Sequence, residues 1–396
     1  MMLSLQLILV LSVLLVFYNY LMYPFLLEIL AKKKEINRVV HAENELPKIA
    51  IVFAAYNEEK VIVAKIKNLA SLNYPTHLVD IHIGLDHPDD ATARLIEQEK
   101  GIKFPVFVHH FKERSGKANV LNKMFQYSFQ KSDYQVIVMM DANIISTENC
   151  LFELIKHFKN KEIGLVGAVI ENTINDQTEI AKQEKFYIRK ESKIKVNEGL
   201  IFESTIGAFG ACYAIRPKFI KPIPSNFLME DFYLSMHVLA SDSKCITEPL
   251  AIVYEDLPGS ILEEFRRRRR ISTGNFQNLR TYLPLLWQKS LKVSFPFFSH
   301  KILRWISPLL ILIAIVNSVV LYSLDSSSIL NKSFFFLMLV NLIMPILDFT
   351  LRSMNINVNL LRLHRYLMSM NFAMFLGFID WVRGVKTNIW KPTERL

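Results

Sequence analysis

The sequence predicts an α/β domain with a doubly wound parallel sheet, flanked by transmembrane helices. Short apolar runs alternate with amphipathic stretches between residues 48 and 141, which is the pattern of consecutive βαβ units. Residues 1–27 and 305–324 carry no formal charge, and both runs exceed the roughly 18 residues expected of a transmembrane helix. With 396 residues, of which 51% are hydrophobic and 21% charged, the chain has room for a large polar domain beside these helices.

Charge and apolar runs divide the chain into three predicted parts. Residues 1–27 form an N-terminal transmembrane helix, and residues 28–294 form a cytoplasmic catalytic domain with basic interfacial helices at its C-terminal end. Residues 295–396 form a membrane region with about three helices and a basic tail. The basic cluster Lys32, Lys33, Lys34 and Arg38 favours a cytoplasmic location for the domain that follows it. We therefore expect a multi-pass protein of the cell membrane whose first helix is not a cleaved signal peptide.

The last two apolar runs leave the topology open. Ser333–Leu347 and Tyr366–Ile379 are uncharged, but at ~1.5 Å per residue they reach only ~21–23 Å of a ~30 Å hydrocarbon core. Four full crossings would place the basic C-terminal tail outside, against the positive-inside rule. We expect four membrane-associated helices, the last being the least suited to an ordinary full span.

Polar clusters follow the predicted strands at residues 48–53, 79–85 and 136–140, and a further strand is expected at 106–109. Asn57 and Glu58 come after the first strand, Asp86 after the second and Asp141 after the last. Because ligands of such sheets bind beyond the carboxyl ends of the strands, we expect these side chains to share one site.

Three acidic clusters and one basic run offer chemistry for a nucleotide-diphosphate ligand. Asp141 and Asn143 could hold Mg²⁺ or Mn²⁺ through hard oxygen ligands, or Asp141 could merely cap a turn. Asp86 and Asp90 could bind a ribose or base, although a turn rich in Asp and Pro has the same composition. Glu230 and Asp231 open a predicted helix, where they could supply a general base or favour the helix dipole.

The five successive arginines Arg266–Arg270 point all round a predicted helix. They could bind diphosphate oxygens, rest on anionic lipid, or do both. The formal net charge of +10 has the same two explanations. No basic stripe interleaved with aromatic residues is present, so nucleic acid is not an expected partner.

Taken in order, these motifs resemble family 2 glycosyltransferases with a GT-A catalytic domain, of the membrane-integrated bacterial polysaccharide-synthase type. The resemblance runs from about residue 48 to residue 273. It includes A-Y-N-E-E at 55–59, D-H-P-D-D-A-T at 86–92, G-K-x-x-x-L-N at 116–122, D-A-N at 141–143, G-x-x-G-x-x-Y-A-x-R at 207–216 and E-D at 230–231. It implies a Rossmann-like mixed sheet that binds a nucleotide-diphospho-sugar.

The resemblance also implies roles for individual residues. Asp231 would be the catalytic base, with Glu230 beside it. The metal ligands would be Asp141 and Asn143. The donor would be bound by Ala55, Asn57, Glu58, Asp86, Asp90, Lys117, Asp141, Arg267 and Arg270, and the acceptor by Gly207, Phe209, Gly210 and Ile271.

Two departures from the family pattern affect the expected activity. Asn143 replaces an aspartate of the metal motif, and the terminal Q-x-x-R-W signature keeps only its arginine, at Arg270. The favoured hypothesis is an inverting transferase that moves a sugar from a UDP-sugar to a polysaccharide. A lipid acceptor, either polyprenyl phosphate or a glycerolipid, is an alternative that fits the lost tryptophan. A catalytically dead nucleotide-binding scaffold is the third.

Overall fold

The computed structural model describes residues 2–37, 39–99, 101–128, 133–172, 179–256 and 260–388. The chain divides into two compact units. The helical unit comprises Met1–Leu26, Glu264–Leu279 and Phe297–Arg383. The sheet unit comprises Leu27–Glu263, Arg280–Pro296 and Gly384–Leu396. Of the residues used for the sequence-based topology, Arg38 and the basic tail beyond residue 388 lie outside the described residues.

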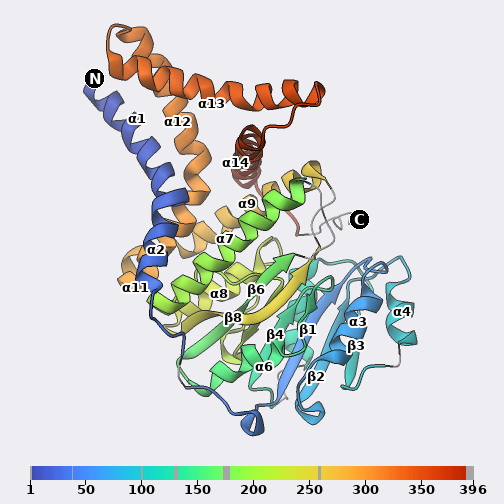
Figure 1. Cartoon of the computed structure of the whole chain (residues 1–396). Helices are drawn as coiled ribbons and strands as arrows, with labels where there is room; N and C mark the ends of the chain where they lie inside the picture. Colours follow the sequence, from blue (N-terminus) through green and yellow to red (C-terminus); the bar gives the residue numbers. More distant parts are fainter. Residues whose placement is uncertain are drawn as a thin grey trace. The chain divides into compact units, whose positions relative to one another are not determined.

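The sheet unit is built on a mixed sheet in which the described residues supply eight strands in the order β3-β2-β1-β4-β7-β6-β8-β5 (Figure 1). Their bounds are β1 (Ile49–Ala55), β2 (Val79–Leu85), β3 (Val106–His110), β4 (Val136–Met140), β5 (Ile145–Ser146), β6 (Ile163–Asn172), β7 (Cys212–Ile215) and β8 (Lys244–Glu255). The first four in this order are parallel, as the sequence predicts. The sheet as a whole is not parallel, because β7 runs antiparallel to β4 and β6, and β5 antiparallel to β8. The mixed sheet implied by the family resemblance is confirmed.

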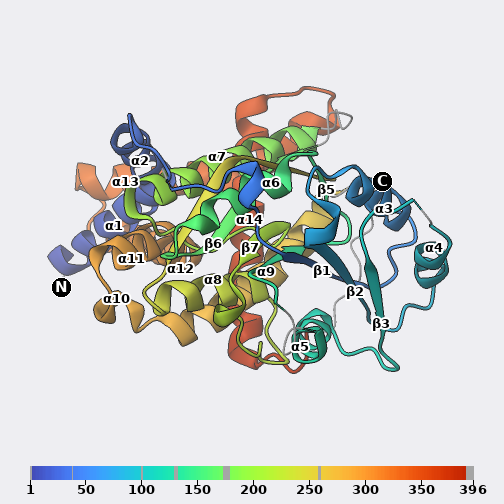
Figure 2. The ribbon, with the colours of Figure 1, turned by 90° about the horizontal axis from the view of Figure 1, so that it is seen from below.

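Helices cover both faces of this sheet (Figure 2). One face packs against α3 (Ile62–Ser71), α6 (Cys150–Ile155) and α7 (Glu179–Phe202), whose apolar residues join one core with alternate residues of β1. On the other side lie α5 (Lys117–Ser128) and α8 (Glu230–Ala240). A side chain at Gly84 of β2 would place its Cβ 2.5 Å from Val120 of α5, so glycine allows this close approach. The shorter α4 (Thr92–Gln98) packs beside α3.

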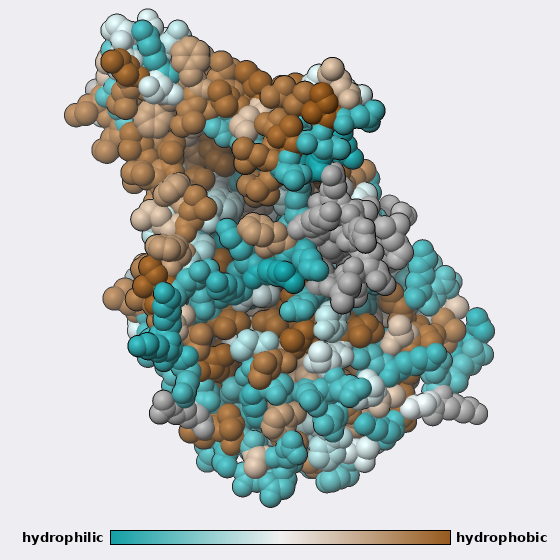
Figure 3. All heavy atoms as spheres, in the orientation of Figure 1, coloured by the Kyte–Doolittle hydropathy of each residue, from teal (hydrophilic) through white to brown (hydrophobic). Residues whose placement is uncertain are grey.

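The helical unit contains α1 (Met2–Phe17), the central part of α9 (Ile261–Tyr282), α12 (Leu303–Leu324), α13 (Ile329–Ser353) and α14 (Asn359–Arg383). α2 (Tyr23–Ala31) continues α1 through a π-helical turn at Tyr18–Met22. α10 (Leu285–Gln288) and α11 (Leu291–Pro296) lead to a second π-helical turn at Phe297–Ile302. Apolar side chains gather over α1, α12 and α13 (Figure 3).

Within the described residues, three helical segments are long and apolar enough to cross a membrane: Met2–Ala31, Leu291–Leu324 and Ile329–Ser353. α14 is not among them. Its Asp380 accepts two hydrogen bonds from Arg269 of α9, at 2.6 and 2.7 Å, and the carbonyl of Gly377 accepts one from Thr273 at 3.1 Å. The expected topology of this last helix stays a prediction.

Candidate active site

The carboxylate of Asp86, directly after β2, fixes the loop that leads into α5. It is almost fully buried, and it accepts hydrogen bonds from the backbone N–H groups of Ser115 at 2.7 Å and Gly116 at 2.9 Å. The backbone of Gly116 has a φ of 86°, which favours glycine. Asp86 therefore shapes the loop before Lys117, whether or not it also contacts a ligand.

The predicted donor-binding residues after β1 are joined to the loop after β2. Asn57, whose φ is 53°, donates to Asp89 at 2.5 Å and accepts from its backbone N–H at 3.1 Å. The backbone N–H of Glu58 donates to the Thr92 hydroxyl at 2.8 Å, and Asp90 caps the same segment by accepting from the Thr92 N–H at 2.9 Å. The two strand ends are thus held side by side, with Ala55 at the end of β1.

Lys117 brings the predicted diphosphate site and the predicted acid pair together. Its Nζ lies 2.6 Å from Oδ1 of Asp141 and 2.5 Å from Oε1 of Glu230. Although burial opposes the charged form, the two carboxylates hold the pKa of Lys117 well above its ordinary value. The ammonium is therefore a permanent cation between residues that lie 89 positions apart in the chain.

Asp231, in the first turn of α8, has the properties expected of a general base. Its side chain is buried, and its Oδ1 accepts the Phe232 N–H at 2.8 Å. Burial and the neighbouring charge of Glu230 raise the pKa of Asp231 to about 6, against the opposing effect of Lys117. A carboxylate with this pKa is ionised at neutral pH and accepts a proton more readily than an exposed aspartate does.

The Gly-rich loop before β7 passes close to this base. A Cβ at Gly210 would lie 2.8 Å from Oδ2 of Asp231, and one at Gly207, whose φ is 76°, would lie 2.4 Å from the Phe232 ring. Lys195 of α7 donates to the carbonyl of Gly207 and lies 4.6 Å from the ring centroid of Phe209. The close approach of the backbone to α8 explains why two of the predicted acceptor residues are glycines.

The residues at the end of β4 fit a divalent cation that takes part of its ligands from the protein and part from a substrate. No group of three or more His, Cys, Asp or Glu side chains suited to a metal occurs among the described residues, so these form no closed cage. Asp141 and Asn143 offer one carboxylate and one amide oxygen, and Mg²⁺ is often bound by few protein ligands together with phosphates and water. The Asn143 side chain is buried, and its Nδ2 has no hydrogen-bond partner in the described part of the chain. Within the described residues, the amide nitrogen of Asn143 therefore holds no other part of the fold in place.

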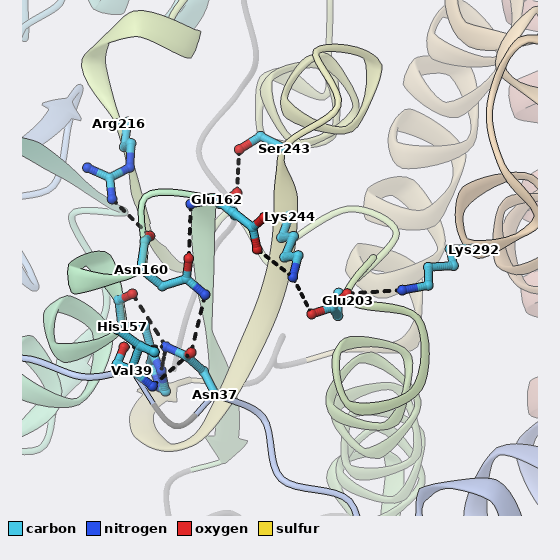
Figure 4. A network of polar contacts seen from close by, with 10 residues as sticks. All are labelled: Asn37, Val39, His157, Asn160, Glu162, Glu203, Arg216, Ser243, Lys244 and Lys292. Carbon is cyan, nitrogen blue, oxygen red and sulfur yellow. Dashed lines mark hydrogen bonds and ion pairs between the residues drawn. The ribbon is translucent and has the colours of Figure 1, made fainter.

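Arg216, which ends the G-x-x-G-x-x-Y-A-x-R motif, has a structural role. It donates to the backbone carbonyls of Ile163 at 2.8 Å and Phe158 at 2.6 Å. It also donates to the carbonyl of Asn160 at 3.1 Å (Figure 4). The motif arginine therefore joins β7 to the start of β6.

Two aromatic residues near the site belong to the quoted motifs, but the sequence indicated no role for either. The guanidinium of Arg114 lies 3.6 Å from the ring centroid of Tyr56, directly after β1. Tyr213 of β7 is 2% exposed, and its hydroxyl has no partner among the described residues. Burial and the charges of Glu230 and Asp231 raise the pKa of Tyr213 well above its ordinary value, which indicates that this hydroxyl is close to the acid pair. An unpaired buried hydroxyl is a signal that only tertiary structure provides.

The remaining predicted residues, Arg267, Arg270 and Ile271, lie on α9 within the helical unit. Within that unit, Arg267 lies 3.7 Å from the buried carboxylate of Glu264, and Arg268 also pairs with it. The roles of Arg267 and Arg270 in donor binding, and of Ile271 in acceptor binding, stay predictions.

Comparison with known proteins shows what the central part of the chain is similar to. Residues 50–222, slightly less than half of the chain, match the sequence model of glycosyl transferase family 2. A poly-β-1,6-N-acetyl-D-glucosamine synthase of Staphylococcus aureus (strain COL) is 32% identical over 143 residues, which are 36% of this chain and 31% of that protein. A β-monoglucosyldiacylglycerol synthase of Nostoc sp. is 21% identical over 258 residues, or 62% of this chain and 52% of that protein. The chain thus spans about a third to a half of the length of these relatives.

The fold also has a counterpart among solved structures. The mannosyltransferase PcManGT from Pyrobaculum calidifontis, in complex with GDP-Man and Mn²⁺, superimposes with a TM-score of 0.69. The match covers 96% of this chain and 99% of that one at 16% sequence identity. At this identity the likeness shows a shared GT-A fold.

Proposed function

Because residues 50–222 carry a family 2 glycosyltransferase domain, we propose that the chain transfers a sugar from a nucleotide-diphospho-sugar, preferably a UDP-sugar, to an acceptor hydroxyl at a membrane. The observation that carries this proposal is the arrangement of Asp231 beside Glu230, with Lys117 joining Glu230 to Asp141. It combines a base of suitable pKa with a cation and oxygen ligands for a diphosphate, which are the groups that the reaction needs.

In the proposed reaction, Asp231 accepts the proton of the acceptor hydroxyl as its oxygen attacks the anomeric carbon. The bond from that carbon to the diphosphate breaks on the opposite face of the sugar, so the configuration inverts. Lys117 offsets the negative charge that the leaving diphosphate gains. A divalent cation held by Asp141 and Asn143 would supply further charge neutralisation when bound. The glycines at 207 and 210 let the acceptor-side loop lie against the base.

The acceptor is proposed to be a growing polysaccharide, with a lipid as the second candidate. The first is supported by the polysaccharide synthase relative, and the second by the glycolipid synthase, whose similarity covers more of this chain. A catalytically dead scaffold is disfavoured because Asp231, Lys117 and Asp141 are all present in a consistent geometry. The cytoplasmic location of the domain and the cell membrane as its site are part of this proposal, supported by three candidate spans and the basic cluster after the first.

Product analysis tests the proposal directly. The detergent-purified chain would be incubated with UDP-sugars and GDP-mannose in turn, each with a polysaccharide primer, polyprenyl phosphate or diacylglycerol. We expect one donor to give a product with one acceptor class, and the Asp231→Asn variant to give none. Hydrolysis or transfer that is equal in the parent and the variant would contradict the proposed role of Asp231.

A further inference from the structure

Lys65 of α3 is a fully buried lysine that has no carboxylate partner in the part of the chain that the structure describes. Its side chain is 0% exposed. Its Nζ donates to the backbone carbonyl of Ile144 at 2.8 Å, lies 3.6 Å from Sδ of Met140, and is 5.7 Å from the ring centroid of Phe53. Burial lowers the pKa of Lys65 to about 8, so the amine still carries a charge at neutral pH. A buried charge without an ion-pair partner is costly, and it is seldom kept without a reason.

The carbonyl that Lys65 binds belongs to the turn that presents Asp141 and Asn143. The N–H of Asp141 donates to the carbonyl of Ala211 at 3.1 Å, and the N–H of Ile144 closes the turn on the carbonyl of Asp141 at 3.3 Å. Lys65 binds the far end of this turn from the core side. The ammonium is therefore a fixed positive charge beneath the backbone that carries the proposed diphosphate and metal ligands.

Holding this backbone does not by itself require a charge. Asn68, one helical turn further along α3, donates to the carbonyl of Ser146 at 2.7 Å and accepts from its N–H at 2.9 Å. A neutral amide thus anchors the next residues of the same segment. Because the carbonyl of Ile144 could be satisfied by a neutral donor in the same way, the hydrogen bond alone does not explain the lysine.

We propose that Lys65 is a positioning residue for the transfer reaction, whose buried charge makes the Asp141–Ile144 turn a better binding site for the diphosphate of the donor. This inference rests on the proposed function and assigns an electrostatic role to a residue outside the family motifs identified in the sequence. The positive charge acts through the turn, and the burial of its surroundings limits screening by solvent. It also offsets part of the negative charge of Asp141 and of the incoming diphosphate.

The test compares two neutral substitutions of Lys65 with a matched substitution of Asn68. Lys65→Met removes the charge and the hydrogen bond. Lys65→Gln removes the charge but retains a donor, on a slightly shorter side chain. Asn68→Ala removes the neutral anchor. Titration calorimetry would measure binding of UDP, GDP, UMP and GMP in the presence of Mn²⁺, and thermal unfolding would measure Tm.

We expect both Lys65 variants to bind the diphosphate about tenfold more weakly, with less than about a twofold change for the monophosphate. Their Tm should equal or exceed that of the parent, since a buried unpaired charge has been removed. Asn68→Ala should show the opposite pattern, with a lower Tm and diphosphate affinity within about twofold of the parent.

Other outcomes separate the two proposals. If the parent binds neither UDP nor GDP, the proposed function fails first. If the parent binds a diphosphate and Lys65→Gln binds it equally well, only the electrostatic role of Lys65 is overturned. A Tm of Lys65→Gln below that of Asn68→Ala would likewise overturn it, because the lysine would then serve the fold.

Discussion

Asp231→Asn should abolish transfer and at the same time stabilise the protein. The substitution keeps the size of the side chain and an oxygen that can accept the Phe232 N–H, but it removes the proton acceptor. Loss of a positioned general base typically costs about 10²–10⁴-fold in rate. In the parent, kcat/KM should rise with pH through about 6, because the base must first lose its proton.

The gain in stability follows from the same pKa. Folding raises the pKa of Asp231 from 3.8 to about 6, so the folded state holds this proton more tightly than the unfolded state does. Ionising the group therefore costs stability as pH rises from about 4 to 6, and the cost at pH 7 is about 3 kcal/mol. Asparagine does not ionise. The variant should have the higher Tm at neutral pH, and the difference should shrink towards pH 4.

The assay pairs nucleoside-diphosphate release with thermal unfolding between about pH 4 and pH 8. Asp242→Asn is the matched control, since the Asp242 side chain is 80% exposed and its contact with Lys289 is a surface ion pair. We expect its stability to stay within about 0.5 kcal/mol of the parent and its activity to be unchanged. The reasoning is refuted if Asp231→Asn retains activity, or if its Tm stays at or below that of the parent over the whole range.

Three further changes probe other parts of the site. Asp141→Ala should weaken binding of UDP or GDP in the presence of Mn²⁺, and affinity that is insensitive to both this change and chelator would remove the metal assignment. Gly210→Ala should lower kcat by at least about tenfold because its Cβ would displace the catalytic carboxylate, whereas Gly101→Ala, with no atom within 4 Å of its Cβ, should behave as the parent. Arg270→Ala should raise KM for the donor more than Arg268→Ala does, while Arg268→Ala should lower Tm because it removes a partner of a buried glutamate. Equal effects of both arginine changes on KM would favour a lipid-surface role for the arginine run.

Much of the sheet unit could be predicted from local patterns. The bounds of β2 and β4 match the predicted runs, and α8 begins at Glu230, as predicted. A short apolar run indicates a strand, and the Asp or Asn that follows it indicates the carboxyl end of that strand. Both signals lie in adjacent residues, so they can be read without the tertiary structure. The shared location of Asn57, Asp86 and Asp141 follows from the same argument.

The order and direction of the later strands needed the tertiary structure. The sequence patterns predict strands only up to residue 140, so β6, β7 and β8 are not among them. β7 lies between β4 and β6 and opposes both, a choice made by long-range pairing and packing rather than by its own four residues. The composition of a strand indicates whether the strand is buried, but it does not specify which strand pairs with it.

The sequence by itself determined which residue types surround the proposed reaction: Asp231, Glu230, Lys117 and Asp141 all stand in recognisable motifs. Only the tertiary structure decided that Lys117 joins two of these acids and that Lys65 lies beneath the metal motif. The physical reason is that a motif reports backbone geometry and residue type over a few positions. The charge state of a buried group depends instead on every group that folding places around it, from any distance along the chain.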